Sequence, residues 1–177
     1  MEINYEQIAF AHFFAHGAHS AVKQARKYTG EPYIEHPWAV SRTVQFYNGT
    51  TDMIVAALLH DVVEDTGITL TTILECFGPK VAGYVSDLTD EYTAEDYPDS
   101  NRAERKQYEA GRYATTCAEV QTIKVADMLD TTPSIAKHDA KFLKAYGPEK
   151  RYLLGKLQKA DNRLWTKADT MLIDLGY

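Results

Sequence analysis

The chain of 177 residues is 45% hydrophobic and 25% charged, and its formal net charge at pH 7 is -6. These values are ordinary for a globular protein, and the length suits one domain with a sizeable core over residues 1–177. The negative charge argues against bulk attraction to a nucleic acid polymer or to an anionic membrane. A phosphate-bearing ligand therefore needs local basic residues or a metal ion.

The two cysteines, Cys76 and Cys117, lie far apart in the sequence and form no CxxC pair. They suggest neither a disulfide framework nor a zinc knuckle, and they fit a reducing compartment. No apolar run approaches the ~20 residues that span a bilayer, and the acidic N-terminus lacks the basic region of a signal peptide. We therefore predict a cytoplasmic protein without a membrane segment.

Apolar residues at helical spacing predict a first helix over residues 4–27, with Asn4 as its N-cap. His12, His16 and His19 lie along this helix at a spacing that could bind zinc. No acid or cysteine accompanies these histidines, so half-buried helix positions are the favoured interpretation.

The same periodicity predicts further helices, and Gly and Pro mark the turns between them. Their approximate ranges are 37–47, 51–66, 70–76, 79–90, 102–115, 117–132 and 149–173. Residues 91–103 are polar and acidic and predict a mobile loop, and whether this loop closes over a ligand stays open. No segment alternates like a β-strand, so the predicted fold class is all-α, a compact multi-helix bundle.

The stretch with most chemistry is residues 56–66, in which His60, Asp61, Glu64 and Asp65 follow an apolar run. Positions four apart share one face of a helix, so these ionisable groups are expected to form one patch at the end of a buried helix. Burying them without partners costs on the order of several kcal/mol per ion. A divalent cation is the simplest partner, and the alternative is a solvated helix end with a chance His-Asp pair.

Two more candidate ligands come from other predicted helices. The candidate metal-binding set is two imidazoles and two carboxylates: His36, His60, Asp61 and Asp127. Such a mixed nitrogen and oxygen set suits Mn²⁺, Fe²⁺ or Zn²⁺ better than Ca²⁺ or Mg²⁺. Glu64 and Asp65 then remain for proton handling.

Five motifs together resemble a known family. In chain order they are Gly30-Glu-Pro-Tyr-Ile-Glu-His-Pro, Ala57-Leu-Leu-His-Asp-Val-Val-Glu-Asp-Thr, Phe77-Gly with Val81, Leu88-Thr-Asp, and Lys124-Val-Ala-Asp. Their order and spacing resemble the HD-domain hydrolases of the RelA/SpoT type, over roughly residues 5–160. In length the chain is similar to the single-domain small alarmone hydrolases of that family.

The resemblance implies roles for particular residues. The four candidate ligands match the metal ligands of the family, which usually hold Mn²⁺, while Glu64 and Asp65 match the acids that orient and deprotonate the attacking water. Arg26 matches an arginine that stacks on the purine, and Lys27 matches a lysine that meets phosphate. The full set of substrate contacts that the resemblance implies is Arg26, Lys27, Tyr33, Lys124, Thr131, Ser134 and Tyr152, with Arg102 or Arg105 as further phosphate partners.

The activity that the resemblance implies is hydrolysis of guanosine tetraphosphate or pentaphosphate. A metal-activated water releases pyrophosphate from the ribose 3′ position and leaves GDP or GTP. Two positions depart from the family pattern, because Met128 replaces a usual Lys or Arg and Thr131 replaces a usual Asn. They keep a second substrate class open, either a deoxynucleoside triphosphate or an adenosine 3′-pyrophosphate. A non-catalytic nucleotide-binding module is a third interpretation, and the oligomeric state stays open.

Overall fold

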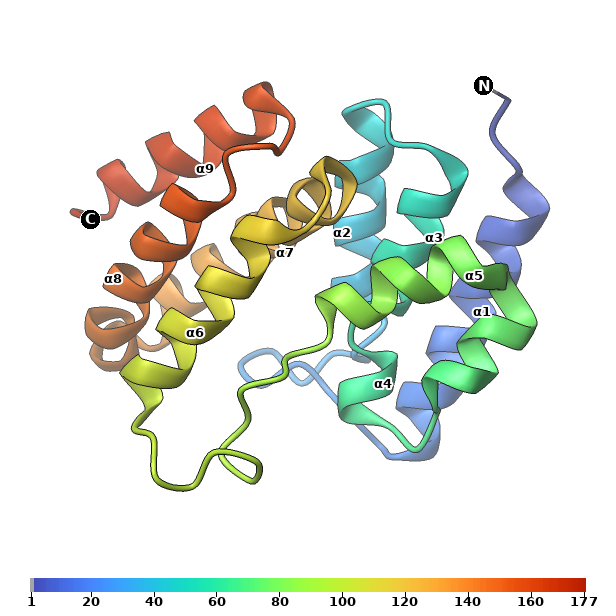
Figure 1. Ribbon diagram of the computed structural model, residues 1–177, viewed down its shortest axis with the longest axis horizontal. Helices are drawn as coiled ribbons and strands as arrows, with labels where there is room; N and C mark the ends of the chain where they lie inside the picture. Colours follow the sequence, from blue (N-terminus) through green and yellow to red (C-terminus); the bar gives the residue numbers. More distant parts are fainter. Residues whose placement is uncertain (1) are drawn as a thin grey trace. The chain divides into compact units, whose positions relative to one another are not determined.

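The computed structural model describes residues 2–177, which form two helical units that divide after Thr89 (Figure 1). Within the described residues the regular structure is helical, apart from one isolated bridge between Ala25 and Pro32. The predicted all-α class is therefore confirmed. One domain over the whole chain stays a prediction, and each unit is described by itself below.

The first unit is built around a short helix that is apolar from Met53 to Leu59. Its helices are α1 Tyr5–Ala21, α2 Glu35–Phe46, α3 Thr51–Leu59, α4 Val62–Asp65 and α5 Leu70–Leu88. Every residue of α3 from Met53 to Leu59 is buried, because α3 contacts α1, α2 and α5 (Figure 1). A helix that is apolar on all sides needs neighbours on all sides. This packing places the end of α3, and the residues that follow it, inside the unit.

The first helix begins as predicted, because the side chain of Asn4 accepts a hydrogen bond from the first turn of α1. It ends at Ala21, so the predicted extension to residue 27 is wrong. Lys23 has a positive φ of 56°, and the Gln24 N–H donates to the carbonyl of His19. These contacts close the last turn and satisfy its carbonyls, so the chain leaves the helix here.

The predicted helix over residues 51–66 is wrong as one element, because it divides into α3 and α4. His60 and Asp61 lie between the two with helical backbone angles, φ -59° and -97°. The N–H of Asp65 donates to the carbonyl of Asp61 at 3.0 Å, which starts α4. The side chains of His60 and Asp61 therefore stand at a junction.

The predicted break at Gly78-Pro79 is confirmed, because Gly78 has a φ of 84° and kinks α5 at this point. A residue with a side chain adopts such a φ only with strain, and Pro79 cannot continue the hydrogen-bond ladder. In the part of the chain that the structure describes, no helix is long and apolar enough to cross a membrane.

The second unit has four helices, α6 Arg102–Thr115, α7 Ala118–His138, α8 Ala140–Lys156 and α9 Asn162–Asp174. Helix α8 contacts the other three, and α7 also contacts α9. The predicted single helix over 149–173 is wrong, because Asp139 caps the start of α8 and Asp161 caps the start of α9. Pro148 lies inside α8 and costs it one backbone hydrogen bond without ending it.

Candidate metal centre

His60 is a buried side chain, 2% exposed, at the junction of α3 and α4. Its Nδ1 lies 2.8 Å from the carbonyl oxygen of Ala57. A carbonyl can only accept, so Nδ1 carries the hydrogen and Nε2 carries the lone pair. That Nε2 lies 3.2 Å from Oδ2 of Asp61. Metal-binding histidines usually donate their second N–H in this way, which fixes the ring orientation.

His36 approaches the same carboxylate from the first turn of α2. It is 3% exposed, and its Nε2 lies 3.6 Å from Oδ2 of Asp61. The His36 and His60 rings are 5.1 Å apart between centroids. The hydroxyl of Tyr33 donates to the same Oδ2 at 2.6 Å. Two imidazoles and a phenol thus converge on one carboxylate oxygen within the first unit.

This donor set fits a divalent transition metal. Two buried imidazole nitrogens and a carboxylate oxygen form the mixed set that Mn²⁺, Fe²⁺ or Zn²⁺ accepts, whereas Ca²⁺ and Mg²⁺ prefer oxygen alone. The fixed ring of His60 supports the fit, because its lone-pair nitrogen faces Asp61. Tyr33 adds the hydrogen bond that a ligating carboxylate needs to keep its orientation.

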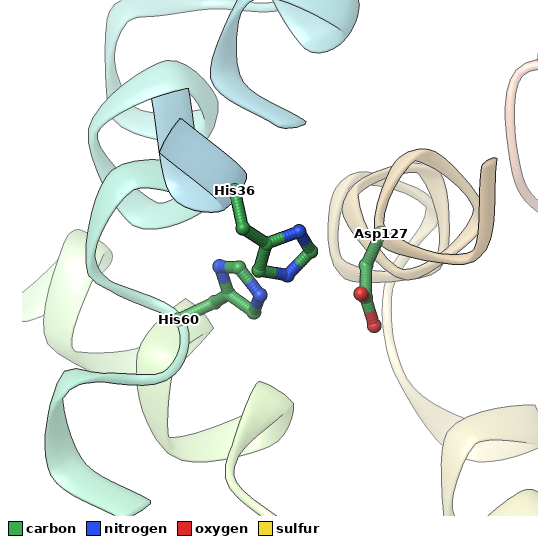
Figure 2. Close-up of side chains that lie close together, drawn as sticks. All are labelled: His36, His60 and Asp127. Carbon is green, nitrogen blue, oxygen red and sulfur yellow. The ribbon is translucent and has the colours of Figure 1, made fainter. Parts of the chain in front are cut away.

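Asp127 lies on α7, where both of its carboxylate oxygens have helix neighbours as partners. Lys124 Nζ lies 3.0 Å from Oδ2, and the Thr131 hydroxyl donates to Oδ1 at 3.1 Å. These contacts follow from the i, i+3 and i, i+4 spacing of one helix face. Figure 2 draws the side chain of Asp127 together with those of His36 and His60 of the first unit.

Asp65 is exposed on α4 and takes part in a hydrogen-bond chain that the sequence did not reveal. The side-chain amide of Gln24 donates to Oδ2 of Asp65 at 2.8 Å. Gln24 Oε1 lies 2.7 Å from Nδ1 of His19, and an amide oxygen can only accept, so His19 donates. His19 is 1% exposed, and burial lowers its pKa, which keeps the ring neutral. The buried, neutral imidazole of His19 therefore orients the side-chain amide of Gln24, and this amide in turn orients the carboxylate of Asp65.

The sequence suggested that the histidines of α1 could bind zinc, but two of them pack against aromatic rings instead. His19 packs against the ring of Tyr33 at 4.8 Å, and His12 packs against Trp38 at 4.8 Å. Among residues 2–177, the group with metal-binding geometry is the one in Figure 2, and it includes none of the α1 histidines. Gln24 gave no local signal, because its position depends on where α1 ends.

The residues predicted to contact the substrate lie in the turn before α2, on α7 and on α8. Arg26 and Lys27 lie in the turn before α2, where the backbone N–H of Arg26 donates to the carbonyl of Glu31 at 2.8 Å. Ser134 is half-buried on α7. Tyr152 is 44% exposed and lines a groove of about 370 Å³ along α6 and α8. Their part in substrate binding stays a prediction.

The two arginines considered for phosphate have protein partners. Arg102 forms a two-point hydrogen bond with the carboxylate of Glu149, with both distances 2.9 Å. Arg105 donates to the backbone carbonyl of Ser100. Glu64 is exposed on α4, next to Asp65.

The sequence pattern of the HD domain family matches residues 11–151, which is most of the chain. The chain belongs to the HD domain family. It is 37% identical over 115 residues to the mouse guanosine-3′,5′-bis(diphosphate) 3′-pyrophosphohydrolase MESH1, a match that covers 63% of this chain and 61% of the relative. The corresponding Drosophila melanogaster protein is 34% identical over 129 residues, covering 71% of this chain and 69% of the relative.

The fold also matches a solved structure. A metazoan ortholog of SpoT, described as hydrolysing ppGpp, superimposes with a TM-score of 0.86 at 24% identity, and the match covers 99% of each chain. This confirms the multi-helix HD-domain fold. The resemblance found in the motifs is confirmed as well. A divalent metal site is typical of HD domains, and the buried histidines with the nearby carboxylates form a site of this kind.

Proposed function

We propose that this chain is a metal-dependent hydrolase that removes pyrophosphate from the ribose 3′ position of guanosine tetraphosphate or pentaphosphate, leaving GDP or GTP. The observation that carries the proposal is the convergence of His36 and His60 on Asp61 in the first unit. The relatives named above are 3′-pyrophosphohydrolases of the same nucleotide, which supports this substrate.

Four residues would hold the ion: His36, His60, Asp61 and Asp127. Manganese is the proposed ion, with Zn²⁺ or Fe²⁺ as alternatives that the same donor set accepts. When bound, such a cation lowers the pKa of water and offsets phosphate charge. The protein contributes the fixed tautomer of His60 and the orientation of Asp61 by Tyr33.

Glu64 and Asp65 are the proposed acids and bases. Both are exposed at the end of the buried stretch, so they can reach a water molecule and exchange its proton with solvent. Asp65 has one oxygen held by Gln24 and keeps a second for water. A carboxylate fixed in this way needs less reorganisation when the proton moves.

Local basic residues explain how a chain of charge -6 would bind a polyphosphate. Lys27 is exposed in the turn before α2, and Lys124 lies beside Asp127. Arg26 is proposed to stack on the purine, and Tyr152 borders a groove of a size that can take part of a nucleotide. The cytoplasm remains the predicted location, because the proposed substrate is a nucleotide and the two cysteines form no CxxC pair.

A nucleotide panel tests the proposal. Purified protein with Mn²⁺ is given ppGpp, pppGpp, ppApp and deoxynucleoside triphosphates, and the released pyrophosphate, triphosphate and phosphate are separated and counted. Pyrophosphate from ppGpp with GDP as the second product supports the proposal. Turnover of only ppApp or only the deoxynucleoside triphosphates contradicts the guanosine assignment. An Asp61→Ala variant must abolish the product, or contaminating enzyme accounts for it.

Two positions favour a second candidate substrate among related nucleotides. Met128 is fully buried, so it cannot supply the charged contact that the family usually has there. The Thr131 hydroxyl donates to Asp127, so its one hydrogen is already used. An adenosine 3′-pyrophosphate or a deoxynucleoside triphosphate is therefore the alternative, and the same panel decides between them. A non-catalytic module would release no product from any member of the panel.

A further inference from the structure

A small cavity in the second unit is lined by one lysine from each of three helices. Lys106 comes from α6, Lys124 from α7 and Lys150 from α8, and the carboxylates of the lining are Asp90, Glu109 and Glu149. The cavity has a volume of about 40 Å³. At roughly 10–15 Å³ for each water, it has room for about three waters.

The carboxylates around this cavity already have cationic partners. Lys106 Nζ lies 2.5 Å from Oδ2 of Asp90. Glu149 is held by the guanidinium of Arg102. Glu109, also in the lining, pairs with Arg112. These ion pairs involve every carboxylate of the lining, and Asp90 acts on Lys150 only through its charge, without a salt bridge.

Within the described part of the chain, Lys150 is the lysine of this cavity that forms no salt bridge. Among the ion pairs of the described residues, none includes Lys150, and its Nζ lies 4.9 Å from the centre of the Tyr146 ring. An aromatic face offsets only part of the cost of a desolvated ammonium. Burial, together with the nearby charge of Lys124, lowers the pKa of Lys150 to about 8, so the amine is still mostly protonated at pH 7.

The cavity also adjoins a candidate metal ligand. Lys124 lines the cavity, and its Nζ lies 3.0 Å from Oδ2 of Asp127. An anion bound between the lysines would therefore be separated from Asp127 only by the side chain of Lys124. Lys124 is held between that carboxylate and the face of Tyr113, whose ring centre is 5.3 Å away.

We propose that this cavity is an anion subsite that binds one phosphate group of the nucleotide substrate, with Lys150 as the principal binding residue and Lys106 and Lys124 beside it. The assignment to the nucleotide rests on the proposed function, whereas the binding of a phosphate anion does not. A phosphate would accept hydrogen bonds from the Lys150 ammonium and add an ion-pair partner to the more distant charges of Asp90 and Asp127.

The direct test is calorimetric titration of metal-free protein with inorganic pyrophosphate and, separately, with inorganic phosphate. Lys150→Met is compared with Lys141→Met, which removes an exposed lysine from the same helix α8. Lys150→Met is expected to bind pyrophosphate about ten- to hundredfold more weakly, and Lys141→Met to bind as the wild type does. Lys150→Arg, which keeps the charge, should retain most of the affinity. Unchanged affinity in Lys150→Met overturns the subsite.

Folding is checked on the same samples by thermal unfolding. Lys150→Met removes a half-buried charge that has no salt-bridge partner among residues 2–177, so its midpoint should equal or exceed that of the wild type, and lost binding then has no cause in unfolding. If Lys150→Met does not fold, Lys150→Gln takes its place, since it keeps a polar end without the charge. The expected loss of pyrophosphate affinity is the same.

Hydrolysis of ppGpp by the metal-loaded enzyme separates this proposal from the proposed function. A higher KM with nearly unchanged kcat in Lys150→Met assigns the cavity to the nucleotide. An unchanged KM with lost pyrophosphate affinity overturns that assignment and leaves a site for free phosphate. If the wild type hydrolyses no member of the panel but binds pyrophosphate through Lys150, the proposed reaction fails and the subsite stands.

Discussion

In the first unit two buried imidazoles face the carboxylate of Asp61, whereas in the second unit three lysines from three helices surround a small cavity. The first group is oriented by hydrogen bonds from uncharged donors, from His60 to a backbone carbonyl and from Tyr33 to the carboxylate. The second group has more positive charge than its carboxylates offset. The comparison shows that one site is built to receive a cation and the other to receive an anion.

The largest expected effect comes from Asp61, because one of its oxygens is the common point of the histidine site. Asp61→Ala removes that oxygen, and we expect a loss of activity of about a thousandfold or more together with loss of bound metal. Elemental analysis and the ppGpp assay measure the two effects on the same samples. Asp61→Asn keeps the shape without the charge, and normal metal content and turnover in both variants would show that the ion lies elsewhere.

Tyr33 tests whether the orientation of that carboxylate matters. Tyr33→Phe removes the hydroxyl that donates to Asp61 and leaves the ring against His19. Losing such a supporting hydrogen bond typically costs about ten- to hundredfold in metal affinity or activity. A metal titration followed by the ppGpp assay gives both values. If only KM rises while metal affinity is unchanged, Tyr33 contacts the substrate instead, as the family resemblance implies.

The cavity site predicts a particular dependence of stability on pH. The pKa of Lys150 is about 8 in the folded protein, against about 10.4 for an ordinary lysine. Between these two values the unfolded chain binds more protons, so the free energy of unfolding rises as the pH rises through this window and is lowered below it. The groups that face Lys150 are Lys124 and Asp127 on α7, Lys106 on α6, and Asp90.

Urea unfolding from pH 7 to 10.5 measures this rise, with Lys150→Met as the comparison. The wild type should gain about 1–2 kcal/mol relative to Lys150→Met across the window, an amount reduced by solvent that reaches the cavity. Added phosphate at pH 7 should narrow the difference, because an anion stabilises the protonated amine. Parallel curves for the two proteins over the whole range would contradict an uncompensated ammonium.

The candidate metal-binding residues could be found from sequence because each lies in a local motif whose spacing survives folding. His60 follows an apolar run that had to be buried, and Asp127 lies just past another. The lysine cavity could not be predicted, because Lys106 and Lys150 come from helices whose contact depends on tertiary packing. The single helix predicted over 149–173 failed for a similar reason, since α8 ends at Lys156 and Asp161 caps a new helix where the periodicity alone continues.

Gln24 is the clearest case of a residue that only the structure could reveal. The sequence predicted a helix through residue 27, which would direct this side chain along a helix surface. The chain instead turns after Ala21, and the Gln24 amide reaches both His19 and Asp65. A contact that depends on the last turn of a helix lies beyond the accuracy with which helix ends are predicted.

The smallest effect is therefore expected at Gln24, which acts through Asp65. Gln24→Leu should lower kcat by roughly three- to tenfold with little change in KM, because a lost hydrogen bond to a charged group costs about 1 kcal/mol or somewhat more. Gln24→Glu places a second acid beside Asp65, so the acidic limb of the pH–rate profile should move to higher pH. Gln45→Leu, at an exposed position of α2, is the matched control. If Gln24→Glu leaves the pH profile of kcat unchanged, Asp65 is not the base of the reaction.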